Sequence, residues 1–115
     1  MNDFLLIFRR DSTPKATPPS PEEMQAAIKP WQDWLGSIAA QNKLVNPPQR
    51  WDAAGKVVKQ NAVTNGPYVE IKEAIGGLIF IKAADYDEAV EIAKGCPILL
   101  EGGNVEIRMT VPGNA

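Results

Sequence analysis

The chain contains no histidine, and this absence excludes more chemistry than any other feature of its 115 residues. Without histidine, the Ser-His-Asp and Cys-His nucleophile systems cannot form, and the usual histidine-rich zinc and iron sites are excluded as well. Cysteine is nearly absent too, because Cys96 stands alone and cannot form an internal disulfide or a thiol-rich metal site. We therefore expect no metal and no other cofactor, and a location in the reducing cytoplasm.

Long runs of one residue type are also missing. Arg9-Arg10 is the longest basic run, and the net charge of −2 offers nothing extended to nucleic-acid phosphates. The apolar run Phe4 to Phe8 has five residues and no basic segment before it, which is too short for a signal peptide or a membrane span. We expect neither direct DNA or RNA binding nor membrane insertion.

What is present fits one small domain. A chain of 115 residues with 44% apolar content can build one hydrophobic core but not two, so we expect a single domain over residues 1–115. Three β-rich segments stand out. They are residues 4–8 and 77–83, which are apolar on both faces, and residues 104–111, which alternate apolar and polar side chains and suit an edge of a sheet or a half-wet interior. Segment 77–83 is expected to be a central strand, with Leu78 and Phe80 on one face and Ile79 and Ile81 on the other.

Two helices are marked by their capping residues. Ser20-Pro21 followed by Glu23 predicts a helix start, after a proline-rich loop over residues 12–21 that is either a lid or a plain connection. Pro30 is expected to kink or split this helix. Asp85 with Glu88 starts a second helix of about ten residues. The apolar stripe of the first helix is expected to face the core: Met24, Ala27, Ile28, Trp31, Trp34, Leu35 and Ile38.

The middle of the chain is harder to interpret. Between residues 42 and 61 only two short strands are expected, at residues 49–51 and 56–59, because prolines and a glycine interrupt any period. The segment 70–75 favours a short helix or helical turn that ends at Gly76.

The order of these elements predicts the fold class: α+β, a ferredoxin-like βαββαβ sandwich. Right-handed crossovers put both long helices on one face of an antiparallel sheet and leave the other face bare. The apolar residues of both parities in segments 4–8 and 77–83 would then meet water, unless a second copy covered them. Covering ~400 Å² of apolar surface contributes on the order of 10 kcal/mol before association costs. We therefore expect a homodimer through the open sheet face.

The most patterned stretch runs from Asn65 to Gly77, and reads Asn-Gly-Pro-Tyr-Val-Glu-Ile-Lys-Glu-Ala-Ile-Gly-Gly. Gly66 and Pro67 favour a tight turn before a polar cluster. The stretch resembles the motif of the YCII-related family, Asp-Gly-Pro-Phe then Ala-Glu-Thr-Lys-Glu and a Gly-Gly pair. The resemblance extends over roughly residues 1–110, with Asn65 in place of the family's Asp and Tyr68 in place of its Phe.

The resemblance implies a dimeric α/β barrel, with a pocket between sheet and helices or near the dimer seam. Similar proteins are often encoded beside alternative sigma factors, which implies a functional link to a sigma-factor system. Some branches of the family are thought to use a His-Asp pair, and this chain has no histidine to supply it. A function carried over from those branches is therefore unsafe.

The remaining acid–base candidates lie in the motif. Glu70 and Glu73 are the candidate catalytic residues, because a buried glutamate can move a proton α to a carbonyl group. The competing interpretation is that they form local salt bridges on a solvated face, and that Tyr68 is a core aromatic. Candidate ligand-binding residues, which would hold a small acidic ligand, are Tyr68, Lys72, Arg9 and Arg108.

Two functions from different classes remain open. The first is a non-catalytic small-molecule-binding or regulatory dimer, which we favour because the missing histidine and Asn65 weaken catalysis and leave binding untouched. The alternative is an enzyme, of isomerase or lyase type, that applies acid–base chemistry to a small acidic or carbonyl metabolite with Glu70 or Glu73 as the base.

Overall fold

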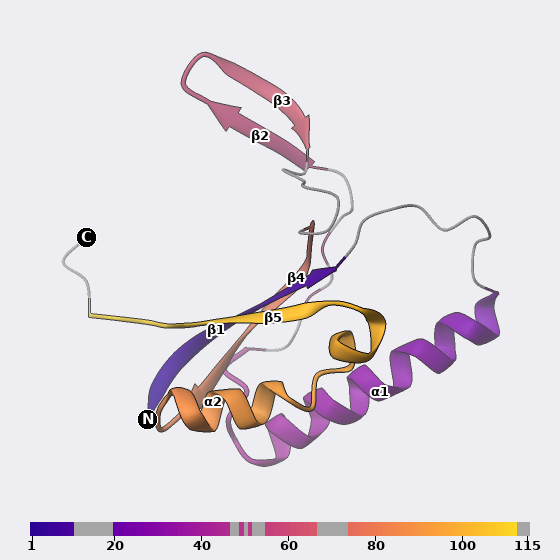
Figure 1. Cartoon of the computed structure of the whole chain (residues 1–115), viewed down its shortest axis with the longest axis vertical. Helices are drawn as coiled ribbons and strands as arrows, with labels where there is room; N and C mark the ends of the chain where they lie inside the picture. The colour runs from indigo at the N-terminus through magenta and orange to yellow at the C-terminus, as the bar shows by residue number, and fades with distance from the viewer. Residues whose placement is uncertain (11–19, 47–48, 50, 52–54, 67–73, 113–115) are drawn as a thin grey trace.

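A computed structural model describes residues 1–10, 20–46, 49, 51, 55–66 and 74–112. The main sheet has three antiparallel strands in the order β4-β1-β5: β4 Ala74–Ala83, β1 Asn2–Arg10 and β5 Asn104–Met109 (Figure 1). The three predicted strand segments are thereby confirmed. Segment 77–83 begins earlier, at Ala74, and β1 rather than β4 is the middle strand of this sheet.

The outer edge of β4 is partly covered by the chain that follows the first helix. Leu44 forms an isolated antiparallel bridge with Ile81. Val45 donates its backbone N–H to the Phe80 carbonyl at 3.0 Å, and Lys82 donates to the Lys43 carbonyl at 2.6 Å. These bonds satisfy backbone groups that an open strand edge would leave to water.

Helix α1 spans Pro21–Ala40 and starts at the residue that its sequence predicts, since the Ser20 hydroxyl accepts the Glu23 N–H at 3.1 Å. The helix is not split at Pro30. Only its second half packs on the sheet: Trp34 and Ile38 are buried, whereas residues 21–30 are all exposed. The expectation that the whole apolar stripe faces the core is therefore wrong for Met24, Ala27 and Ile28.

Helix α2 spans Tyr86–Ala93, close to the predicted length. Its capping is reciprocal, because the Asp85 carboxylate accepts the Glu88 N–H at 2.9 Å and the Glu88 carboxylate accepts the Ala84 N–H at 3.2 Å. A short 3₁₀ helix, η1 Pro97–Glu101, follows and leads through two glycines into β5. None of the helices in the described part of the chain is long and apolar enough to cross a membrane.

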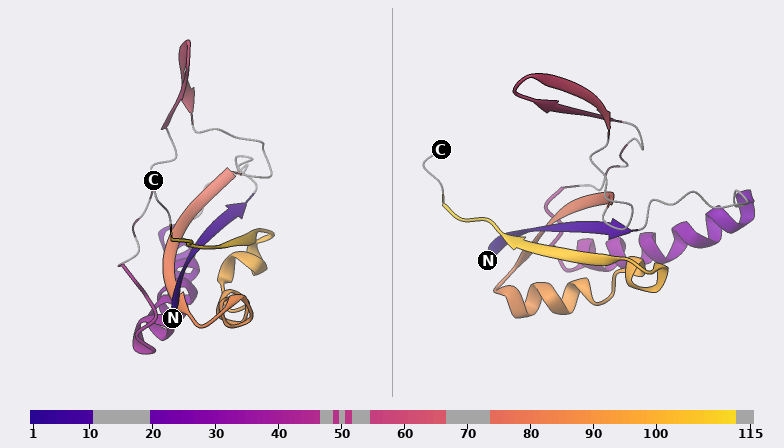
Figure 2. Two further views of the ribbon diagram at one scale, coloured as in Figure 1. Left: turned by 90° about the vertical axis from the view of Figure 1, so that its left-hand side faces the viewer. Right: turned by 45° about the horizontal axis from the view of Figure 1, so that its top comes forward.

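A separate two-stranded hairpin joins β2 Gly55–Lys59 to β3 Ala62–Gly66 and stands away from the main sheet (Figures 1 and 2). It confirms the strand expected at residues 56–59, but Gln49 and Trp51 lie outside any strand. One further expectation is wrong, because Ile75 and Gly76 belong to β4 instead of ending a helix. Gly66 ends β3, and Pro67, the other residue of the expected tight turn, lies outside the described residues. Residues 70–73 of the expected helix and residues 12–19 of the expected proline-rich loop lie outside the described residues.

The core lies on one face of the sheet, between the strands and both helices. Both helices lie on the same side of the strands (Figure 2). Alternate residues of β1 and β4 are buried against side chains from α1, α2 and η1. The buried set comprises Phe4, Leu6, Phe8, Trp34, Ile38, Ile79, Ile81, Ala83, Ala89, Ala93, Cys96 and Ile98. The architecture is that of a ferredoxin-like α+β fold, with both helices on one face as predicted.

The opposite face of the sheet, here called the open face, carries none of the helices in the described ranges. Strand register fixes its composition, because paired residues share a face. On this face Leu5 of β1 lies between Phe80 of β4 and Arg108 of β5. Two residues further along β1, Ile7 lies between Leu78 and Glu106. The predicted division of β4 is confirmed, since Ile79 and Ile81 are buried while Phe80 is 36% exposed.

Candidate functional site

The predicted site residues divide between two parts of the chain. Tyr68, Glu70, Lys72 and Glu73 lie in the segment 67–73, outside the described residues. Arg9 and Arg108 are described, on β1 and β5. The residue that follows the segment 67–73 is described. Ala74 comes directly after Glu73 and pairs with Arg10 at the end of β1.

Arg9 and Arg108 are brought together by a carboxylate between them. Arg9 Nη1 lies 2.8 Å from Glu106 Oε1, and Arg108 Nη1 lies 3.3 Å from Glu106 Oε2. All three side chains belong to the open face, where Glu106 is one alternate position from Arg108 and is cross-strand to Ile7. We call Arg9, Glu106 and Arg108 the arginine pair cluster.

The charges of this cluster do not cancel. Two guanidinium groups share one carboxylate, which leaves a formal charge of +1 beside the apolar residues Leu5 and Ile7 of the open face. The Arg9 side chain is 26% exposed and that of Arg108 is 70% exposed, so one cation is partly desolvated and the other is mostly solvated. An anion near both would gain charge-assisted hydrogen bonds, which are strongest where water is partly excluded.

The floor beside the cluster is hydrophobic. Leu5, Ile7 and Leu78 are half-buried there, and Phe80 extends the same surface. A ligand that carries one carboxylate and a short apolar body would match this combination of charge and surface. Without a second layer, however, the face is a flat sheet surface and not a cavity.

On the helix side of the same sheet end lies a second ionic contact, from Arg10. Its Nη1 lies 3.9 Å from Glu101 Oε1, and the Trp31 indole N–H donates to Glu101 Oε2 at 3.2 Å. A Cβ atom on Gly76 would lie 2.7 Å from the Arg10 Nε atom. The first glycine of the motif's Gly-Gly pair therefore leaves room for this guanidinium group against the backbone of β4.

The tryptophans serve mainly as core residues. Trp34 is buried and donates its indole N–H to the Ile92 carbonyl at 3.0 Å. Phe8, Trp31 and Trp34 form mutual edge-to-face contacts with ring centroids 5.2 to 6.0 Å apart. Trp51, the third tryptophan, is 56% exposed and is not part of this cluster.

Cys96 has no sign of a reactive environment. It is 2% exposed, and its burial raises the pKa of the thiol to about 11, away from the reactive thiolate. In the residues that the structure describes, no group of three or more His, Cys, Asp or Glu side chains could hold a metal ion.

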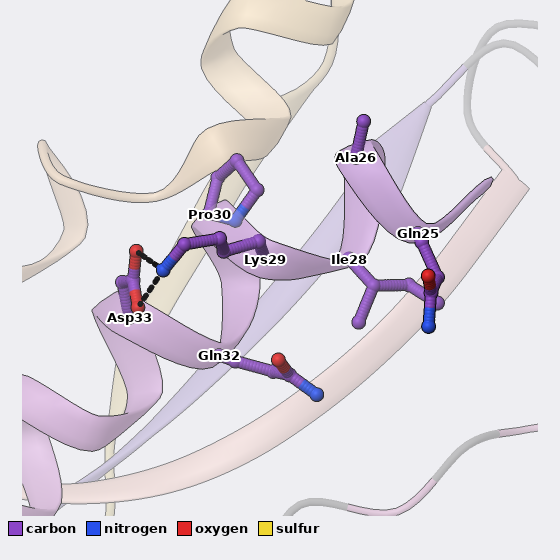
Figure 3. Close-up of a pocket in the computed structure, with 7 residues that line it drawn as sticks. All are labelled: Gln25, Ala26, Ile28, Lys29, Pro30, Gln32 and Asp33. Atoms are coloured by element: carbon purple, nitrogen blue, oxygen red, sulfur yellow. Dashed lines mark hydrogen bonds and ion pairs between the residues drawn. The ribbon is translucent and has the colours of Figure 1, made fainter. Parts of the chain in front are cut away.

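A surface hollow on α1 is lined by exposed residues of that helix (Figure 3). Lys29 and Asp33 lie within it and form an ion pair at 3.2 Å one helical turn apart. This pair is exposed and bonds along its own helix, so it is a local stabilising contact and brings no chemistry from elsewhere in the fold.

Sequence reasoning misses the central residue of the site. Arg9 and Arg108 are expected from the sequence to hold an acidic ligand, and Glu106 is not among the candidates. The two-residue spacing of Glu106 and Arg108 on a strand is the available signal for a shared face. The role of Glu106 as the link to Arg9 depends on the register of β1 against β5, which no local pattern gives.

The fold places this chain among ferredoxin-like α+β domains that carry both helices on one face of the sheet and leave the other open. The family model of the YCII-related domain matches residues 5–112, which is nearly the whole chain. The chain therefore belongs to the YCII-related family. A comparison with curated proteins found no match.

Proposed function

We propose that this protein binds a small organic anion at the arginine pair cluster, without catalysis, as a homodimer whose open faces meet. The observation that carries the proposal is the uncancelled positive charge of Arg9, Glu106 and Arg108 at the border of an apolar surface. Such a border matches a carboxylate with an apolar body. The single buried thiol, Cys96, is consistent with a cytoplasmic location.

The dimer is proposed because an uncovered open face leaves apolar side chains exposed to water, which is unfavourable in free energy. Leu5, Ile7, Leu78 and Phe80 form a contiguous apolar surface by strand register. Removing ~400 Å² of apolar surface from water contributes on the order of 10 kcal/mol before the cost of association. A second copy would also close the space above the cluster, and a closed space strengthens ionic contacts with a ligand.

The hydrogen bonds of Glu106 favour binding without catalysis. Both of its carboxylate oxygens accept a guanidinium hydrogen bond, so its position is that of a residue that orients the two arginines. The chain also has no histidine to act as a base. Among its described residues, the site therefore has two anion anchors and one carboxylate, which is held between them.

One observation favours the competing function, an acid–base enzyme of isomerase or lyase type. Ala74 pairs with Arg10, so the residue next to Glu73 lies at the sheet end that carries Arg9. A base at Glu70 or Glu73 close to the anchored anion would convert the binding site into a catalytic one. If the wild-type protein converts a bound carboxylate to a product, and Glu70→Gln or Glu73→Gln abolishes this turnover, the enzyme is the correct alternative.

The test is a thermal-shift screen with small carboxylic acids of increasing apolar length at constant ionic strength. A ligand at 100 times its dissociation constant stabilises the folded state by about 2.7 kcal/mol, which is a readily measured rise in midpoint. Arg108→Gln should abolish that rise, because its side chain reaches the ligand and is 70% exposed, so folding is little affected. Lys94→Gln is the matched control, since Lys94 is a mostly exposed cation beside α2, paired with Glu91.

Two results would refute the proposal. One is a screen in which no acid raises the midpoint; the other is an equal effect of Arg108→Gln and Lys94→Gln on binding. The dimer is tested separately by analytical ultracentrifugation. If the wild-type protein is a monomer at micromolar concentration, the dimer is refuted. If the wild type is a dimer, the Phe80→Glu variant should be a monomer, because the substitution places a charge on the open face.

A further inference from the structure

The β2–β3 hairpin is the one element of the described chain that takes no part in the core. Its strands pair in register from Gly55↔Gly66 to Lys59↔Ala62, and Gln60-Asn61 make the turn. Both sets of ribbon views show it standing away from the main sheet (Figures 1 and 2). Its valines Val58 and Val63 are directly opposite each other and are 76% and 62% exposed.

A hairpin of this kind is not expected to be stable alone. Isolated two-stranded hairpins are marginal in water, and an apolar cross-strand pair facing solvent adds to the cost. Within the described ranges no further strand pairs with the outer edge of β2 or β3, and open edges are ready templates for contact with another chain. The radius of gyration, 15.8 Å, also exceeds the value of about 13 Å for a compact domain of this length.

The net charge of the hairpin indicates what kind of surface would bind it. Residues 55–66 contain Lys56 and Lys59 and no acidic residue, so the hairpin carries +2. The whole chain carries −2, so the remainder, here called the body, carries −4. The hairpin and the body are therefore electrostatically complementary, yet the hairpin does not lie against the body of its own subunit.

We propose that each hairpin is an exchange arm that packs its Val58–Val63 pair against the body of a second copy of this chain. In a two-fold dimer the exchange is reciprocal, so each copy gives one arm and receives one. The lysines then face the carboxylates of the partner's body, and the valine pair is removed from water. This inference rests on the homodimer proposed above and adds a second contact to the one between open faces.

The test uses Val58→Thr with Val63→Thr in the full-length protein. Threonine keeps the shape and the β preference of valine but places a hydroxyl in any apolar contact, and the exchange buries the pair twice in each dimer. We expect sedimentation equilibrium to show a dimer dissociation constant at least tenfold higher. Val111→Thr is the matched control, because Val111 is 73% exposed and lies beyond the end of β5, and it should leave the dissociation constant unchanged.

A second measurement uses the wild-type protein alone. Hydrogen exchange of the hairpin amides should slow as protein concentration passes through the dissociation constant. If these amides exchange equally fast in monomer and dimer, or if the threonine variant dimerises as tightly as wild type, the arm is refuted. A wild-type dimer that Phe80→Glu disrupts while the threonine variant does not would refute the arm and leave the open-face dimer standing. A wild type that stays monomeric at all concentrations would overturn both.

Discussion

Gly103 is the position where the loop after η1 has the least room, and replacing it with alanine is a sharp test of the described packing. A Cβ atom there would lie 2.4 Å from the Arg9 carbonyl oxygen and 2.6 Å from Ile98 Cγ1. The first of these is backbone of the middle strand, so it cannot turn aside as a side chain would. The Gly103 N–H also donates to the Ile98 carbonyl at 2.9 Å, which holds the loop in place.

The expected loss follows from these contacts. Forcing an extra methyl group into a filled site typically costs about 1–3 kcal/mol. For a domain of this size that corresponds to a melting temperature lower by about 4–12 °C. Because Gly103 directly precedes β5 and touches Arg9, the same change should also disturb the contact between Arg9 and Glu106 and weaken anion binding.

The matched control is Gly36→Ala in α1. Nothing lies within 4 Å of a Cβ atom at that position, and the residue sits inside a helix. Alanine is favoured over glycine there by roughly 0.5–1 kcal/mol, so this variant should be more stable than wild type. Urea unfolding of both variants measures the difference. Gly103→Ala with wild-type stability would contradict the close approach of the η1–β5 loop to β1. Gly36→Ala with reduced stability would contradict the open space beside that position in α1.

Three further predictions follow from described contacts. Cys96 should react very slowly with thiol reagents at pH 8 in the folded protein and at a normal rate in urea, because burial raises its pKa to about 11; equal rates in both states would refute its burial. The thiol's contribution to stability is fully present below its ordinary pKa of 9.0 and should be lost as pH rises from there toward about 11, because the unfolded chain releases the proton first. Asp85→Ala should lower the free energy of unfolding by about 1 kcal/mol through loss of the α2 cap, whereas Asp87→Ala, in the first turn without a capping bond, should cost clearly less in the same urea titration.

Local signals predict the secondary structure where a residue's chemistry acts on its neighbours. The Ser20 and Asp85 caps start both helices at the predicted positions, because a side-chain oxygen reaches an N–H only three residues away. The parity of Ile79 and Phe80 is also confirmed, since alternation along a strand is fixed by backbone geometry. The motif is less readable: Ile75 and Gly76 lie in a strand because pairing with β1 outweighs a local helical preference.

The sequence by itself determined the fold class, the lack of histidine chemistry and the apolar character of both faces of β1. Tertiary structure alone decided that β1 is the middle strand, that half of α1 extends past the sheet, and that Glu106 joins Arg9 to Arg108. The physical reason is the separation along the sequence over which each interaction acts. Caps and alternation act over a few residues, whereas the cluster depends on the register between strands almost a hundred positions apart, which only the folded sheet fixes.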